Sequence, residues 1–244
     1  MNGTFHIGAT GLRSQQRALD VIANNIANIN TPAFKRTDVR FSELVRGADG
    51  EGAPSGVGAS AKGRVFAQGD LRRTGEALDL AISGEGFLEL LGPAGRTLLW
   101  RGGSMKVDRD GFLAAAEGAR LKAMISVPAG ASDLTIGRGG EVSATVDGET
   151  IEIGRLDVVL PKDSTALSAL DGGLYEASDE ADLTVVAPGE EGGGVLIQGS
   201  LEGANVQLSD EMVALLMTQR AYAASAQIVQ AGDQLMSIAN SLRR

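Results

Sequence analysis

The sequence predicts an α+β protein in which a long helix at each end of the chain flanks a central, compact all-β domain. Both ends carry apolar residues at seven-residue spacing, the pattern of an amphipathic helix. The chain has 34 glycines, and all but Gly3, Gly8, Gly11 and Gly232 lie within residues 46–204. Neither end buries its apolar stripe alone, so each needs a partner helix from the other end or from another copy. This pattern favours an assembly protein, although ordinary core helices of a globular domain are the simpler alternative.

The first predicted domain, residues 1–31, is a coiled-coil helix. Its apolar side chains recur every seven residues, and two more follow three residues after a member of that series: Phe5, Leu12, Leu19 and Ile26, then Ile22 and Ile29. This is the a/d spacing of a coiled-coil seam. Pro32 ends the helix, because proline has no N–H to donate and pushes the preceding residue out of the α region.

Residues 32–66 are predicted to form an extended, glycine-rich connector. Within this segment, residues 46–63 consist largely of glycine, alanine and serine and contain almost no large apolar side chain. Such a composition is typical of a flexible or extended segment. The connector therefore separates the N-terminal helix from the β domain.

The β domain is predicted to span residues 67–200. Short apolar runs alternate with turn signals, which favours a compact β structure over alternating βαβ units. Asp108–Gly111 has the composition of a hairpin turn. The expected strands are Leu78–Ile82, Phe87–Leu91, Met105–Val107, Phe112–Leu113, Leu121–Val127, Leu134–Ile136, Glu141–Val146, Thr150–Ile153, Leu156–Leu160 and Leu183–Val186.

The last predicted domain, residues 201–244, is a second coiled-coil helix. Its seven-residue series is Leu208, Leu215, Tyr222, Val229 and Met236. Acidic residues at 210 and 211 and arginines at 243 and 244 suit the two ends of the helix dipole. The predicted helix is much longer than the usual three or four turns, which favours a coiled coil.

Composition excludes several classes of function. The net charge is −9, and the excess of acid lies in the middle of the chain, which argues against binding nucleic acid or an anionic membrane surface. The chain has no cysteine, so the sequence predicts neither a disulfide framework nor a thiol nucleophile. No apolar run approaches the roughly 20 residues of a membrane span. The start of the sequence lacks the basic and apolar regions of a secretory signal, so any export from the cytoplasm is expected to use a route that needs no cleaved signal.

A search for catalytic or binding motifs predicts no enzyme, no cofactor and no metal. His6 is the only histidine. Asp108–Gly111 resembles the start of a calcium loop, but the twelfth position, where that loop needs a glutamate, is Ala119. Gly192–Gly194 lacks the spacing of a dinucleotide fingerprint, and the phosphate-binding loop and the nucleophile elbow are also missing from the sequence.

Three stretches resemble the signatures of bacterial flagellar rod and hook proteins. They are Gln15–Lys35, with the run Asp20-Val-Ile-Ala-Asn-Asn-Ile-Ala-Asn-Ile-Asn-Thr-Pro-Ala-Phe34-Lys35; Gln68–Phe87; and Gly199–Met236. The residues that match the family signature are Asn24, Asn25, Asn28, Thr31, Pro32, Phe34, Lys35, Gly84, Gly86, Phe87, Gln219 and Arg220. One departure is Ala33, which stands where the family usually has glycine.

The resemblance implies a structural subunit of the distal rod, with a proximal-rod subunit as the nearest alternative. It implies that the terminal helices pair as an antiparallel coiled coil and that the chain polymerises helically into a hollow drive shaft. The expected assembly interface consists of Leu12, Leu19, Ile22, Ile26, Leu208, Leu215, Tyr222, Val229 and Met236. A soluble helical adaptor or export-associated binding protein is the alternative from another class.

The resemblance also implies partners and a location. The expected partners are further copies of the chain, other rod subunits, hook or hook-adjacent axial proteins, the surrounding P and L bushing rings and the flagellar type III export apparatus. The expected location is the basal body, where the rod spans the periplasm. By analogy with the family, residues 46–63 are expected to contact adjacent subunits and set the stiffness of the rod, with a slack connector as the alternative.

Overall fold

The computed structural model describes residues 2–46, 53–178 and 181–241. The chain forms two compact units. A helical unit comprises Met1–Ile29, Arg36–Val65 and Val206–Arg244, and a β unit comprises Asn30–Lys35 and Phe66–Asn205.

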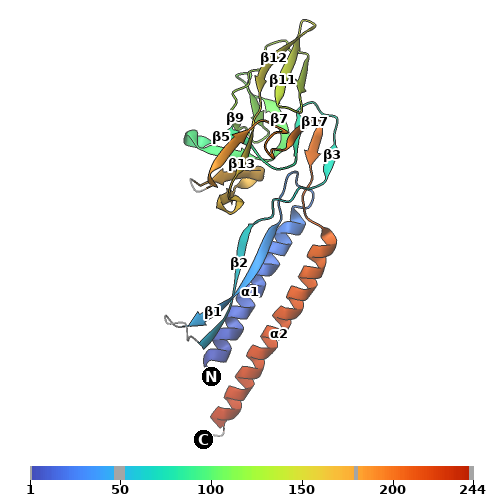
Figure 1. Cartoon of the computed structure of the whole chain (residues 1–244). Coiled ribbons are helices and arrows are strands. Elements are labelled where there is room, and N and C mark those ends of the chain that lie inside the picture. Colours follow the sequence, from blue (N-terminus) through green and yellow to red (C-terminus); the bar gives the residue numbers. More distant parts are fainter. Residues whose placement is uncertain (1, 47–52, 179–180, 242–244) are drawn as a thin grey trace. The chain divides into compact units, whose positions relative to one another are not determined.

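The helical unit contains two long helices and a β-hairpin. Helix α1 (Asn2–Ala27) and helix α2 (Leu208–Ser241) lie side by side in opposite directions (Figure 1). Strand β1 (Thr37–Arg46) pairs with β2 (Ala53–Arg64) in an antiparallel hairpin beside α1 (Figure 1). Helix α1 ends earlier than the predicted residue 31, and the side chain of Asn28 donates to the carbonyl of Asn24 at 2.9 Å. Asparagine weakens a last helical turn in this way, because it competes for backbone groups.

Residues 32–66 do not form the predicted extended connector, because most of their described part is paired in a β-hairpin. This β1–β2 hairpin is anchored on α1, while residues 47–52 lie outside the described residues. Ser14 Oγ donates to the carbonyl of Val57 at 2.8 Å, and Arg17 Nη1 donates to that of Ala59 at 3.0 Å. A side chain at Gly56 would overlap Thr10 Oγ1. The small residues thus let a strand approach the helix closely, which composition alone does not reveal.

The β unit is built on a nine-stranded sheet with the order β14-β15-β6-β5-β9-β8-β7-β4-β17. Its strands are β4 (Asp79–Ser83), β5 (Leu88–Leu91), β6 (Thr97–Trp100), β7 (Gly102–Val107), β8 (Leu113–Ala115), β9 (Arg120–Leu121), β14 (Leu167–Ala169), β15 (Leu174–Ala177) and β17 (Val195–Gln198). Smaller sheets are formed by β10 (Asp133–Ile136), β11 (Glu141–Val146) and β12 (Glu149–Arg155), by β13 (Val158–Pro161) with β16 (Leu183–Val186), and by β3 (Leu71–Arg73) with β18 (Ser200–Glu202). Short 3-10 helices occupy Pro93–Gly95, Ser164–Ala166 and Asp171–Gly173.

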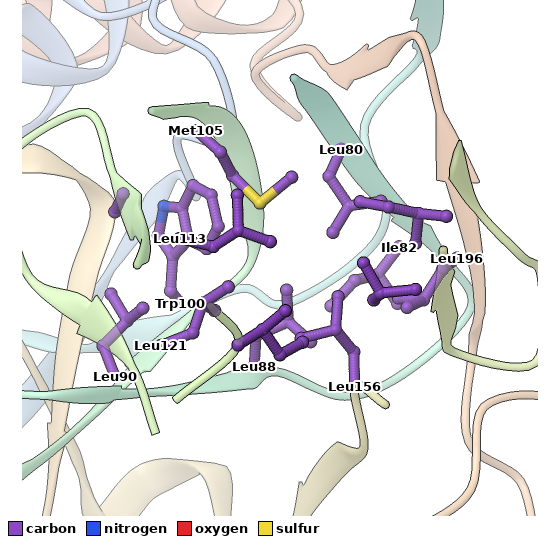
Figure 2. Close-up of a cluster of buried hydrophobic side chains, with 14 of the residues drawn as sticks. Leu80, Ile82, Leu88, Leu90, Trp100, Met105, Leu113, Leu121, Leu156 and Leu196 are labelled. Atoms are coloured by element: carbon purple, nitrogen blue, oxygen red, sulfur yellow. The ribbon is translucent and has the colours of Figure 1, made fainter. Parts of the chain in front are cut away.

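Apolar side chains from these strands meet in one large core (Figure 2). Leu80 and Ile82 of β4, Leu90 of β5 and Leu196 of β17 are fully buried. Figure 2 shows them gathered with Trp100, the only tryptophan of the chain. The fluorescence of this side chain therefore reports on the folding of the β unit.

Most expected strands coincide with observed ones, and the exceptions have local causes. The strand expected at Leu121–Val127 stops at Leu121, because Met124 has a φ of 49° and its N–H donates to the carbonyl of Leu121 at 3.0 Å. Six strands of the β unit lie outside the predicted ranges: β3, β6, β14, β15, β17 and β18. Several of these pair with distant segments, as β17 does with β4, so their strand form depends on partners remote in sequence.

Candidate functional site

The facing surfaces of α1 and α2 are lined by small side chains. A side chain at Gly8 would overlap Val229, Gly11 lies next to Ser225, and Gly232 lies next to the ring of Phe5. The fully buried positions of α1 are mostly small or polar: Gly8, Gly11, Ser14, Ala18, Ile22 and Asn25. Small residues let two helices approach closely, and Gly8, Gly11 and Gly232 do so here, whereas Ser14 contacts the hairpin.

The structure gives the expected interface residues different environments. Ile22 is buried, and the half-buried members are Leu12, Leu19, Ile26, Leu215 and Val229. Leu208, Tyr222 and Met236 are exposed in the single chain. The heptad positions of α2 are therefore only partly covered by α1.

Large apolar side chains remain exposed along α2. They are Met212, Val213, Leu216, Met217, Ile228, Leu235 and Ile238, in addition to the three heptad residues. The most exposed is Met217, at 68%. Large exposed apolar side chains gathered on one helix mark a site of protein association.

A polar cluster lies where α1, α2 and the hairpin meet. Asn25 is buried, and its side chain both accepts from the N–H of Thr37 and donates to the carbonyl of Thr37, each at 3.0 Å. Its Nδ2 also lies 3.3 Å from both carboxylate oxygens of Glu211. Buried polar contacts of this kind select one register of a helix pair. The sequence places Asn25 in the family signature and Glu211 in the acidic first turn of the C-terminal helix, but it does not predict that the two side chains meet.

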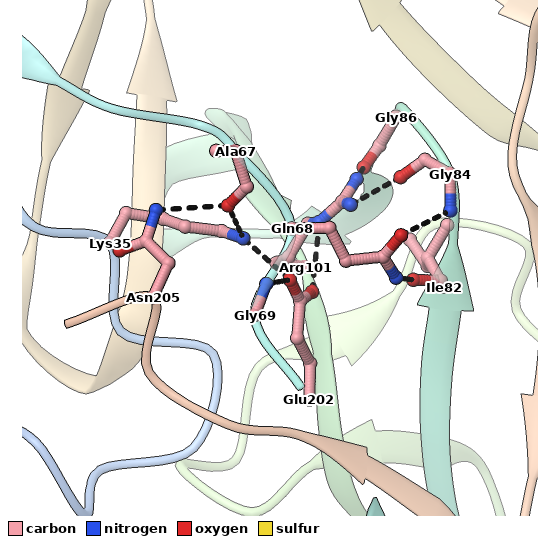
Figure 3. Close-up of polar contacts among 10 residues, drawn as sticks. All are labelled: Lys35, Ala67, Gln68, Gly69, Ile82, Gly84, Gly86, Arg101, Glu202 and Asn205. Carbon is pink, nitrogen blue, oxygen red and sulfur yellow. Dashed lines mark hydrogen bonds and ion pairs between the residues drawn. The ribbon is translucent and has the colours of Figure 1, made fainter. Parts of the chain in front are cut away.

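A second polar cluster, the ion cluster of Lys35, Arg101 and Glu202, lies inside the β unit (Figure 3). Lys35 Nζ donates to Glu202 Oε1 at 2.6 Å and to the carbonyl of Ala67 at 2.9 Å. Arg101 Nε donates to Glu202 Oε2 at 3.1 Å. These three side chains are almost completely buried, so each charge depends on the others for compensation.

The ion cluster explains the limits of the β unit. Lys35 follows α1 in the chain and Glu202 precedes α2, and their contact holds Asn30–Lys35 and the last residues before α2 within the β unit. The sequence instead predicts that residues 32–35 belong to the connector and residues 201–205 to the C-terminal helix domain. Arg101 lies between β6 and β7 and Glu202 lies in β18, and neither has a local sequence signal for burial, since single charged residues are ordinarily exposed.

Two glycines of the family signature, Gly84 and Gly86, accept hydrogen bonds from Arg101 of the ion cluster. Arg101 Nη1 donates to the carbonyl of Gly86 at 2.5 Å, and Nη2 donates to that of Gly84. Both glycines have positive φ, 114° at Gly84 and 116° at Gly86, which turns their carbonyls toward the guanidinium. Gln68 braces the same turn, because its side chain donates to the carbonyl of Ile82 and accepts from the N–H of Gly84 (Figure 3).

Phe87 follows this turn and belongs to an aromatic cluster. Its ring meets those of Phe66 and Tyr175 edge to face, with centroids 5.5 and 5.6 Å away. The other signature residues differ in exposure. Phe34 is buried and Asn28 is half-buried, whereas the exposed ones are Asn24, Thr31, Pro32, Gln219 and Arg220.

Burial destabilises the charged form of Lys35. Its pKa is lowered from the ordinary value of 10.5, chiefly because burial removes water from the ammonium group, and the nearby charge of Arg101 lowers it further. The hydrogen bond and the charge of Glu202 oppose this shift. The folded protein therefore binds fewer protons at Lys35 than the unfolded chain does, over the range between the lowered pKa and 10.5.

This shift predicts a pH dependence of stability. Because the unfolded chain binds more protons in that range, the contribution of Lys35 to the free energy of unfolding should rise as the pH rises toward 10.5. Urea unfolding followed by Trp100 fluorescence, at a series of alkaline pH values, should show wild type gaining stability relative to Lys35→Met. A difference between the two proteins that stays constant across the range would contradict the prediction.

Ala33 adopts a backbone conformation that favours glycine. Its φ is 56°, its side chain is buried, and its N–H donates to the carbonyl of Glu202 at 2.7 Å. This is the position at which the resembling family usually has glycine. The conformation is needed there to bring the Ala33 N–H to β18, at a strain of about 1–2 kcal/mol for a residue with a side chain.

Substitution of Ala33 should separate backbone strain from packing. Ala33→Val should lower the free energy of unfolding by about 1–3 kcal/mol, because a β-branched residue is poorly accommodated at positive φ. Ala33→Gly should stay within about 1 kcal/mol of wild type, since relief of strain offsets the lost methyl group and the more flexible unfolded chain. Urea unfolding measures both. Equal losses for the two variants would contradict the role assigned to the backbone.

The carboxylates of the Asp108–Gly111 turn are bound by nearby backbone N–H groups and by Arg120. Asp108 Oδ1 accepts from the N–H groups of Asp110 and Phe112, each at 2.9 Å, and these bonds lower the pKa of Asp108. Arg120 pairs with both Asp108 and Asp110. Across residues 2–46, 53–178 and 181–241, no three His, Asp or Glu side chains are grouped as metal ligands. His6 is exposed on α1.

Comparison with known families relates the chain to proteins of the flagellum. Family models match in order along it: the flagella basal body rod protein at residues 5–35, the flagellar hook protein FlgE/F/G D1 domain at 81–144, and the flagellar basal body rod FlgEFG protein C-terminal region at 197–242. In the described residues, neither helix combines the length and apolar content that crossing a bilayer requires.

Curated relatives match over nearly their whole length. The flagellar basal-body rod protein FlgG of Borreliella burgdorferi is 32% identical, over 97% of each chain. FlgG of Caulobacter vibrioides is also 32% identical, over 96% of this chain and 97% of its own. FlgF of Caulobacter vibrioides is 30% identical, over 94% and 93%. The chain therefore belongs to the flagellar basal-body rod protein family and is a structural subunit of the rod, not an enzyme.

Proposed function

We propose that this chain assembles helically with copies of itself into the distal rod, the hollow shaft that carries motor torque to the hook. The observation that carries the proposal is the apolar surface left exposed along α2, because a helix keeps such a surface only when another molecule covers it. The relatives named FlgG support the distal position. A heterologous contact that does not close into a ring generates a filament.

In this proposal α1 and α2 form an antiparallel coiled coil that lines the inside of the tube. The antiparallel arrangement of the two helices and the contact between Gly8 and Val229 support it. The half-buried Leu12, Leu19, Ile26, Leu215 and Val229 would become fully buried in the polymer, together with the exposed Leu208, Tyr222 and Met236. Ile22 and the small residues hold the pair together within one copy.

The β1–β2 hairpin is proposed to contact adjacent subunits and stiffen the rod. Phe41 and Leu44 of β1 are 49% and 41% exposed, which supplies apolar surface for such a contact. The remaining proposed partners are other rod subunits, the hook or hook-adjacent proteins, the P and L rings and the type III export apparatus. The proposed route is export without a cleaved signal, with the assembled rod spanning the periplasm.

The direct test is electron microscopy of the purified chain at rising concentration, with and without isolated basal bodies as seeds. Wild type should form hollow tubes above a critical concentration. The double variant Leu19→Asp/Tyr222→Asp should form none, since both aspartates would be buried in the proposed seam. Wild type that stays monomeric even with seeds would refute self-assembly and favour an adaptor that binds a different partner.

A further inference from the structure

Glu211 is a buried carboxylate without a basic partner in its own unit. Its exposure is 4%, and both of its oxygens lie 3.3 Å from Asn25 Nδ2. Within the described part of the chain, no basic side chain lies within 4.0 Å of it. The N-terminal end of α2 supplies only about half a positive charge. Buried carboxylates are normally matched by a cation, so this one is only partly compensated.

Glu211 lines a cavity of about 230 Å³ formed by α1, β1 and the start of α2. Three carboxylates border this cavity, those of Asp38, Asp210 and Glu211, against the single guanidinium of Arg36. Arg36 already lies 3.6 Å from Asp38. The cavity therefore has both the space and the charge for a further basic side chain.

Arg220 of α2 is the corresponding cation without a nearby carboxylate among the described residues. It is exposed, and no described carboxylate lies within 4.0 Å of it. At helical spacing it lies on the side of α2 that carries the exposed apolar residues, between Leu216 and Met217 around the helix. Any molecule that covers this face removes Arg220 from water, and a buried cation needs a carboxylate.

The two side chains do not meet within one chain. Arg220 follows Glu211 by nine residues, which separates them by about 14 Å along α2 and by about half a turn around it. Glu211 of one copy can therefore pair with Arg220 only when that arginine belongs to a different copy. A contact between two different surface patches of identical subunits is heterologous, which is the type that propagates along a filament.

We infer that Arg220 of one copy enters the cavity of a neighbouring copy and pairs with its Glu211 carboxylate. The inference rests on the proposed self-assembly and adds a specific ion pair to it. It gives a role to a charged residue that lies among the large exposed apolar side chains of α2. It also makes the register of the neighbouring α2 helix depend on one charge–charge contact, because a shifted neighbour would bury both charges unpaired.

A double-mutant cycle on assembly tests the pair. Glu211→Gln and Arg220→Gln should each raise the critical concentration at least about tenfold, because each leaves the other charge buried and unpaired. The double variant should be no worse than the weaker single variant. Arg13→Gln, which removes an exposed arginine of α1, is the matched control and should assemble as wild type does. Unfolding midpoints of the monomers verify that all variants fold.

The outcomes separate the pair from self-assembly itself. Single effects that multiply in the double variant, in a wild type that forms tubes, would overturn the pair and leave the proposed function standing. A wild type that forms no tubes would overturn both. Cross-linking gives a second readout, since the chain has no cysteine of its own.

Small amounts of Arg220→Cys and Asp210→Cys, assembled together in an excess of wild type, should be joined by a short bismaleimide only in tubes. Replacing Arg220→Cys by Gln219→Cys moves the thiol to the flank of the helix and should give much less product. Equal yields from the two positions, or product from unassembled protein, would overturn the assigned contact.

Discussion

Glu202→Gln is expected to lower the free energy of unfolding of the β unit by about 3–5 kcal/mol. Glutamine keeps the shape of the side chain, but it removes the only negative charge that Lys35 and Arg101 share in the ion cluster. Two cations would then remain buried without compensation. Urea unfolding followed by Trp100 fluorescence measures the loss, because this side chain lies in the β-unit core.

Lys35→Met provides the matched comparison. It leaves Arg101 and Glu202 as a neutral pair and removes a cation whose pKa burial has already lowered. Its loss should be smaller, about 1–2 kcal/mol, mainly from the two hydrogen bonds of the ammonium group. Lys122→Met, which breaks an exposed pair with Glu89, should lose less than about 1 kcal/mol. Equal losses for Glu202→Gln and Lys35→Met would show that net charge does not govern the cluster.

Met217→Asp is expected to abolish tube formation while leaving the monomer as stable as wild type. Met217 is 68% exposed in the single chain, so the substitution should change the free energy of unfolding by less than about 0.5 kcal/mol. In an assembly that covers this face, a buried unpaired carboxylate costs several kcal/mol per subunit. Since 1.4 kcal/mol corresponds to about a tenfold change in affinity, the critical concentration should rise by about 100-fold or more.

Sedimentation and electron microscopy at matched concentrations check this expectation. Ile228→Asp, on the same face, should behave in the same way. Met217→Leu keeps the apolar character and about the same volume, so it should assemble at the concentration of wild type. Tubes from Met217→Asp at that concentration would show that the exposed face of α2 is not part of the assembly contact.

The sequence predicted helices, turns and strands correctly where neighbouring residues alone decide them. The a/d spacing of Leu12 and Leu19 and the breaker Pro32 correspond to α1, and the turn at Asp108–Gly111 joins β7 to β8. Strands such as β11 and β16 match their predicted limits. The family signature included Lys35, Gly84 and Gly86 in two separate stretches, and it did not predict their shared contacts with Arg101 and Glu202.

The sequence by itself therefore determined the α+β class, the two terminal helices and the membership of an assembly family, because periodicity and short motifs depend on neighbours along the chain. The tertiary structure decided which faces meet. Small residues such as Gly8 and Gly11 let α2 approach α1 closely, and this contact leaves the large apolar residues of α2 exposed. It also decided that Lys35, Arg101 and Glu202 share one buried site, because compensation of charge depends on distance in space and not on separation in sequence.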